Sequence, residues 1–247
     1  MNPDSIAPLA LNAWLRYDAL SRMLPPGVTD VLEVGCGQGG FGVRLAQRYK
    51  YLGVEPDPTS CAVAQHRIEM AGRGEVRNIA VEDLGDDQFD MVCAFEVLEH
   101  FEDDAAAVKS WTARLRPGGW LVVSMPAHND RLGPFDELVG HYRRYDHAMV
   151  AALLEPLGFE QVETRLFGVP LGYALETARN VVGKRRLAQA KTSSAEERTA
   201  GSGRVMQPRG SALGLATRVA TAPFRLVQRG FPAHGTGLIA RARRKRS

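Results

Sequence analysis

The sequence predicts an α/β fold in which helices cover both faces of a parallel sheet. Short apolar runs of strand length alternate with segments of helical spacing over residues 28–167. These runs are apolar at nearly every position, as expected for strands that are buried on both sides. Hydrophobic residues make up 45% and charged residues 24% of the 247 residues, which excludes a wholly disordered or disulfide-stapled chain.

The elements follow one another in a regular order. A helical segment is expected over residues 1–27, because leucines recur at helical spacing before a Pro-Pro-Gly stop. Buried strands are expected at 31–34, 51–54, 76–81, 91–95 and 120–125, and helices at 41–49, 59–71, 104–115 and 147–157. Asp103 or Asp104 can cap the third of these helices and Asp146 the fourth.

The C-terminal part departs from this alternation. Residues 159–167 alternate like an edge strand, and residues 235–242 form a short apolar run that can pair with them. We therefore expect a basic, partly flexible helical insertion over 168–235, followed by the last strand and a basic tail over 236–247.

A glycine-dense turn, VLEVGCGQGG, joins the first strand to the next helix. In this geometry bare backbone can approach a nucleotide-like ligand. Glu55 ends the next strand, where its carboxylate can accept hydrogen bonds from both ribose hydroxyls. Glu33 inside the first strand would repel a pyrophosphate but suits the cationic amino acid group of S-adenosylmethionine (SAM). The acid therefore favours SAM over NAD, and a salt bridge to a basic side chain is its structural alternative.

Taken as a set, these segments resemble the class I SAM-dependent methyltransferases over roughly residues 28–167. VLEVGCGQG is similar to the first motif of that family, YLGVEPD to its ribose-binding strand end, FDMVCAFEVLEHFED to its fourth strand and LRPGGWLVVSMP to its fifth. The resemblance implies a Rossmann-like, doubly wound sheet of seven strands, mostly parallel with an antiparallel last strand. It also implies methyl transfer from SAM to a small-molecule or to a lipid- or glycan-linked acceptor, at oxygen or nitrogen.

The same resemblance assigns residues to the cofactor. Three glycines would pack against SAM, one acid would lie near its amino acid group and another would hold the ribose. An acidic residue after the third strand would reach the adenine amine, and Glu82 is the alternative for this last contact. The residues expected to bind SAM are Glu33, Gly35, Gly37, Gly39, Glu55 and Asp83.

Two histidines are candidate catalytic residues. His100 follows the fourth strand and can take a proton near neutral pH, or it can position the loop beneath SAM. The run GHYRRYD resembles a GHxRRY element of one branch of the family, and its His141 is a second candidate base, with His128 a weaker one. Arg143 and Arg144 can bind a carboxylate or phosphate of the acceptor, or fasten a charged loop to nearby acids.

Charge is divided unevenly along the chain. Up to residue 183 there are 16 Lys and Arg against 26 Asp and Glu, whereas residues 184–247 carry 15 against two. Within residues 211–229, Arg218, Arg225 and Arg229 share one helical face, with apolar residues opposite. This pattern is typical of a helix on an anionic membrane surface, or of one packed on its own domain. Nucleic acid is disfavoured, because aromatic residues are scarce there.

Other expectations concern what the chain lacks. No apolar run reaches the roughly 18 residues needed to span a bilayer, and no secretory signal is visible. The three cysteines lack metal-ligand spacing, so no metal is expected. Their small number indicates a reducing compartment, and we expect a cytoplasmic protein that can bind peripherally at the inner membrane face. Two rival functions remain, an NAD-binding oxidoreductase and a non-catalytic SAM-fold binding protein.

Overall fold

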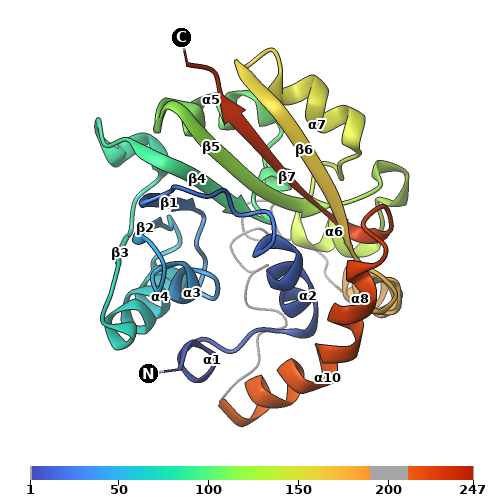
Figure 1. Ribbon diagram of the computed structural model, residues 1–247. Coiled ribbons are helices and arrows are strands. Elements are labelled where there is room, and N and C mark those ends of the chain that lie inside the picture. The colour runs from blue at the N-terminus through green and yellow to red at the C-terminus, as the bar shows by residue number, and fades with distance from the viewer. Residues whose placement is uncertain (1, 190–210, 247) are drawn as a thin grey trace.

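A seven-stranded mixed sheet organises the protein, as seen in the computed structural model, which describes residues 2–189 and 211–246 (Figure 1). The strands in the order β3-β2-β1-β4-β5-β7-β6 form one continuous sheet. Their bounds are β1 Asp30–Val34, β2 Lys50–Val54, β3 Glu75–Arg77, β4 Phe89–Phe95, β5 Leu115–Pro126, β6 Phe159–Gly168 and β7 Gly235–Arg244. The first five pair in parallel, and β7 lies antiparallel between β5 and β6. The expected fold class and the pairing of the last two strands are thereby confirmed.

Helices connect and cover these strands. Their bounds are α1 Pro3–Ile6, α2 Leu11–Leu20, α3 Gly42–Leu45, α4 Pro58–Ala71, α5 Asp104–Ala113, α6 Pro134–Val139, α7 His147–Leu154, α8 Leu171–Gln189 and α10 Ser211–Arg229. Short 3₁₀ helices occur at η1 Val81–Leu84, η2 Leu98–His100 and η3 Asn129–Arg131. Asp103, one of the two expected caps of α5, accepts the backbone N–H of Ala106 at 2.9 Å.

The two faces of the sheet carry separate apolar cores. Val92 of β4 points into one core, together with Trp111 of α5. The preceding strand residue, Met91, points into the other core, which contains Leu15 and Leu20 of α2. Side chains alternate between the faces of a strand, so a strand buried on both sides reads as a continuous apolar run. The N-terminal helical segment therefore packs directly on the sheet.

Besides β5, which begins at Leu115 and not at residue 120, three elements differ from the sequence prediction. The helix expected at 41–49 is the single turn α3. The third strand ends at Arg77, because the Asn78 side chain donates to the carbonyls of Glu55 and Pro56 at 2.7 and 3.0 Å and turns the chain away. The helix α6 was not expected, although it begins at a proline and ends at a glycine in the left-handed region, as helices commonly do.

The arginine face of α10 is turned toward the protein, opposite to the membrane interpretation. Arg218 pairs with Asp4, and Arg229 pairs with Asp18 at 2.6 Å, which fastens α10 to α1 and α2 (Figure 1). Arg218 and Arg229 stay partly exposed at these pairs, and α10 also exposes the apolar residues Leu215, Val219, Leu226 and Val227, with exposed fractions between 44 and 63%. Within the described ranges, no helix combines the length and apolar character needed to cross a membrane.

Candidate active site

The glycine turn lies at the carboxyl end of β1 and leaves open space on one side. Gly35, Gly37 and Gly39 all have φ between +54 and +73°, which favours glycine. A Cβ atom added to Gly35 would lie 2.8 Å from a methyl carbon of Val97, so this glycine serves close packing. A Cβ added to Gly37 would meet no described atom within 4 Å. The backbone of Gly37 therefore borders space in which a nucleoside can lie.

Glu55 at the end of β2 is held against this turn. Its two carboxylate oxygens accept the backbone N–H groups of Gly37 at 2.8 Å and Asp57 at 2.9 Å. These two hydrogen bonds fix the carboxylate at the carboxyl end of β2, beside the turn. Open backbone at Gly37 and a fixed carboxylate beside it are what SAM requires at this edge of the sheet, and these residues fit that cofactor.

The two acids considered for the adenine contact have different surroundings. Glu82 accepts a hydrogen bond from the Ser110 hydroxyl of α5 at 2.7 Å. Asp83, the preferred residue, is exposed on η1. Glu82 is exposed as well, and the adenine contact of Asp83 stays a prediction.

Glu33 has a partner that the sequence did not predict. It is 3% exposed and accepts a hydrogen bond from the Tyr51 hydroxyl at 2.6 Å. Burial raises the pKa of Glu33 to about 8, although the Tyr51 hydrogen bond acts in the opposite direction. A phenol is thus the partner shown here, and not the basic side chain that was the structural alternative for Glu33.

A polar pocket opens beyond the ends of β4 and β5, between the sheet and α8. Its charged lining consists of Glu96, Asp136, His141, Arg144, Glu176 and Arg179. Glu96 directly follows β4 with φ of +58°, a conformation that is uncommon for residues other than glycine. It pairs with Arg16 of α2 at 2.9 Å and accepts a hydrogen bond from Ser124. Strained backbone of this kind is often found at functional sites.

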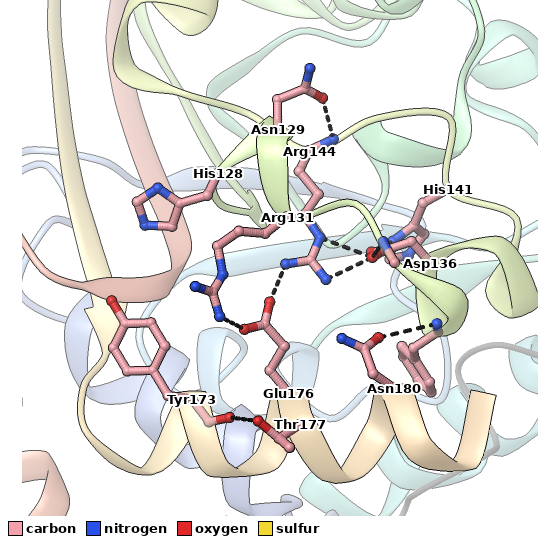
Figure 2. A network of polar contacts seen from close by, with 12 residues as sticks. His128, Asn129, Arg131, Asp136, His141, Arg144, Tyr173, Glu176, Thr177 and Asn180 are labelled. Carbon is pink, nitrogen blue, oxygen red and sulfur yellow. Dashed lines mark hydrogen bonds and ion pairs between the residues drawn. The ribbon is translucent and has the colours of Figure 1, made fainter. Parts of the chain in front are cut away.

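The two arginines expected to bind substrate are held by acids of the protein. Arg144 is 4% exposed, donates to Asp136 at 2.9 and 2.6 Å and also pairs with Glu176 (Figure 2). Arg143 pairs with Asp104 at 2.6 Å. Their substrate-binding assignment therefore lacks structural support, and the alternative of a loop fastened to nearby acids describes both residues.

The two candidate catalytic histidines lie together, and their rings are 4.7 Å apart between centroids. The Nδ1 atom of His141 is 2.8 Å from Asp136, and His141 lines the pocket. Burial, followed by the neighbouring His141, lowers the pKa of His100 to about 4, so His100 is neutral at pH 7. The weaker candidate His128 uses Nε2 to contact the carbonyl of Gly235 at 2.9 Å.

Sequence reasoning missed several residues of this region, among them Arg179 and Glu99. Arg179 of α8 lines the pocket and has no hydrogen bond or ion pair to any residue that the structure describes. The sequence of the insertion did not indicate that α8 packs beside the sheet, so Arg179 could not be placed at the pocket. Glu99 is fully buried beside the histidines, and its place in VLEH was visible but was not interpreted.

Comparison with known proteins agrees with this geometry. Residues 32–121 match the family model described as a methyltransferase domain. A ubiquinone biosynthesis O-methyltransferase of Chromobacterium violaceum is 35% identical over 115 residues, which are 44% of this chain and 50% of that protein. A probable S-adenosylmethionine-dependent methyltransferase of Mycolicibacterium smegmatis is 34% identical over 146 residues, 55% and 53% of the two chains. The chain thus spans about half the length of these relatives.

Solved structures share the fold at low identity. A SAM-dependent methyltransferase from Thermotoga maritima, described as a possible histamine N-methyltransferase, has a TM-score of 0.56 at 19% identity, covering 94% of this chain and 89% of that one. Phosphoethanolamine N-methyltransferase 2 of Haemonchus contortus, crystallised with SAM, has a TM-score of 0.57 at 18% identity, covering 97% and 54%. Residues 32–121 therefore resemble a methyltransferase domain, and the sheet order is that of a Rossmann-like methyltransferase fold.

Proposed function

We propose that this protein transfers a methyl group from SAM to an acceptor in the pocket beside Glu96 and His141. The observation that carries the proposal is the position of two sites at one edge of the sheet. The open turn at Gly37 with Glu55 suits a nucleoside, and the polar pocket lies past the neighbouring strand β4. Because the sulfonium of SAM is already electrophilic, the protein must align the acceptor, exclude water and accept a proton.

Residue roles follow from this arrangement. Gly35, Gly37 and Gly39 cradle SAM, Glu55 and Asp83 hold its ribose and adenine, and Glu33 supports the amino acid end through the turn. Proton removal is assigned to His141, whose ring is oriented by Asp136, and His100 positions the loop. The GHxRRY branch is supported by the fact that its His141 and Arg144 both line the pocket.

We assign recognition of an anionic group on the acceptor to Arg179. Of the two arginines that line the pocket, Arg144 is committed to Asp136 and Glu176. Arg179 has no such pair within the described part of the chain: the ring of Phe135 lies 5.6 Å from its guanidinium, and Glu96 and Glu176 attract it without a direct contact. An unpaired guanidinium at a partly buried pocket wall favours a carboxylate or phosphate ligand.

Arg179→Met should lower transfer of radiolabelled methyl groups from SAM to anionic acceptors at least about 10-fold, by raising the acceptor KM. SAM affinity should be unchanged, since Arg179 lies outside the glycine turn. The measurement is a screen of paired anionic acceptors and their neutral amides or esters. Arg186→Met on the exposed part of α8 removes the same charge and serves as the control. Equal transfer by both variants would reject Arg179, and no transfer to any acceptor by the wild type would reject the enzyme proposal.

We also propose that the apolar face of α10 docks on a membrane at the inner face, which would bring a lipid- or glycan-linked acceptor to the pocket. The observation in its favour is the exposed stripe Leu215, Val219 and Leu226 on a helix whose arginines are anchored to α1 and α2. Insertion of apolar side chains, rather than arginine contacts alone, would then supply the binding energy.

Val219→Glu or Leu226→Glu should therefore reduce flotation with lipid vesicles several-fold, because each places a charge in the apolar stripe. Met70→Glu, at an exposed apolar position on α4, adds the same charge elsewhere and should float like the wild type. A wild type that stays with the soluble fraction would contradict the membrane proposal and leave the enzyme proposal intact.

A further inference from the structure

Three metal-ligating side chains meet beside the pocket, although only His141 lines it. Glu99 and His100 come from η2 after β4, and His141 follows α6. One nitrogen or oxygen of each residue lies within 4.8 Å of the corresponding atoms of the other two. The Nε2 atom of His141 is 3.9 Å from a carboxylate oxygen of Glu99. A carboxylate and two imidazoles from separate segments thus converge on one point.

The protons of this cluster are directed away from its centre. The Nδ1 atom of His141 donates to Asp136 at 2.8 Å, which leaves the Nε2 lone pair toward Glu99. The Nδ1 atom of His100 is buried without a hydrogen-bond partner among the described residues. His141 therefore presents an unprotonated nitrogen atom toward Glu99, and His100 adds a nitrogen atom with no competing partner.

Glu99 is the member of the cluster whose burial is energetically most unfavourable. It is 0% exposed, and neither of its oxygens has a hydrogen-bond partner among the described residues. Burial and the nearby charge of Glu96 hold the pKa of Glu99 well above its ordinary value. An unpaired buried carboxylate is unfavourable, because nothing replaces the hydration it has lost. A cation at the centre would satisfy the carboxylate and both lone pairs at once.

We propose that Glu99, His100 and His141 bind a divalent transition-metal ion, with Zn²⁺ the best match. Two imidazoles and one carboxylate are a set that zinc accepts, and its open fourth position takes a water or substrate oxygen. Ligand bonds of about 2.0–2.2 Å place tetrahedral ligand atoms about 3.4 Å apart, so small side-chain rotations close the present spacing. Asp136 is then the outer carboxylate that orients a ligating histidine.

The ion would face the acceptor through His141, which lines the pocket. The ion would bind the lone pair of His141, so this imidazole could no longer accept a proton. The ion would ease proton loss from the acceptor instead, because an oxygen bound to it becomes more acidic. The sequence expectation of no metal depended on cysteine spacing alone. That expectation did not consider histidines and a carboxylate that come together from two distant segments.

Protein stripped with a chelator and titrated with Co²⁺, followed by visible absorbance, tests the site. Co²⁺ should bind once per chain, and Zn²⁺ should displace it. Glu99→Gln and His141→Ala should each weaken Co²⁺ binding at least about 10- to 100-fold. The matched controls Glu69→Gln and His66→Ala, at exposed positions of α4, should bind like the wild type.

Thermal unfolding without metal shows whether each variant is folded, and added Zn²⁺ should raise the unfolding temperature of the wild type and the controls only. Absence of stoichiometric binding in the wild type, or unchanged binding in folded Glu99→Gln, would overturn the proposal. SAM binding is measured separately, so a chain that binds metal but not SAM refutes the proposed reaction and leaves the metal site standing.

Discussion

Replacing Gly37 with leucine is expected to reduce SAM affinity at least about 100-fold, or about 2.7 kcal/mol, while the protein stays folded. The new side chain enters the space beside the turn, where a Cβ atom meets no described atom within 4 Å. It therefore competes with the cofactor and not with the core. The φ of +54° adds strain of about 1–2 kcal/mol for a residue other than glycine.

A matched variant separates the effect of backbone strain from the effect of filling the space beside the turn. Gly27 has φ of +73° and also no described atom within 4 Å of an added Cβ, but it precedes β1 and lies outside the turn. Gly27→Leu should lose similar stability and keep the SAM affinity of the wild type. Calorimetry with SAM, its demethylated product and NAD is the measurement. NAD binding without SAM binding in the wild type would favour the oxidoreductase alternative, and unchanged SAM binding by Gly37→Leu would contradict the placement of the cofactor.

The fold was predictable because its signals are local. Continuous apolar runs reveal strands buried on both faces, and the turn at residues 35–40 is defined by backbone that only glycine adopts easily. The contact between Glu55 and Gly37 follows from the parallel pairing of β1 and β2, which brings their carboxyl ends together. The part of the candidate site built from strand ends could therefore be placed before the structure was known.

The roles of the charged residues were less predictable, because charge partners come from distant segments. Arg144 resembles a substrate ligand in the sequence, yet it is held by Asp136 and by Glu176 of the insertion. The pattern of α10 was compatible with a membrane surface or with packing on its own domain, and Arg218 pairs with Asp4 near the other end of the chain. A helical periodicity specifies which residues share a face and not what that face contacts.

Arg144→Met should lower the free energy of unfolding by about 3–5 kcal/mol, the largest stability loss expected at this site. Methionine keeps most of the volume but leaves Asp136 and Glu176 buried with one cationic partner fewer. Removing one partner of a buried ion pair is costly, because the remaining charge cannot regain its hydration. Arg143→Met is the matched control: its partner Asp104 is more exposed, so its loss should be about 1 kcal/mol or less.

Acid titration of stability gives an independent measure of the same network. Burial alone would raise the pKa of Asp136, but hydrogen bonds from His141 and Arg144 lower it from the ordinary 3.8 to about 2. The stabilisation from this depressed pKa is therefore complete above about pH 4 and is lost as the pH falls toward 2, by about 2 kcal/mol. Urea unfolding at a series of pH values should show this loss in the wild type and in Arg143→Met, and a smaller one in Arg144→Met. If the two arginine variants have equal stability and equal acid sensitivity, Arg144 does not anchor the loop, and its guanidinium is available to the acceptor as the sequence first suggested.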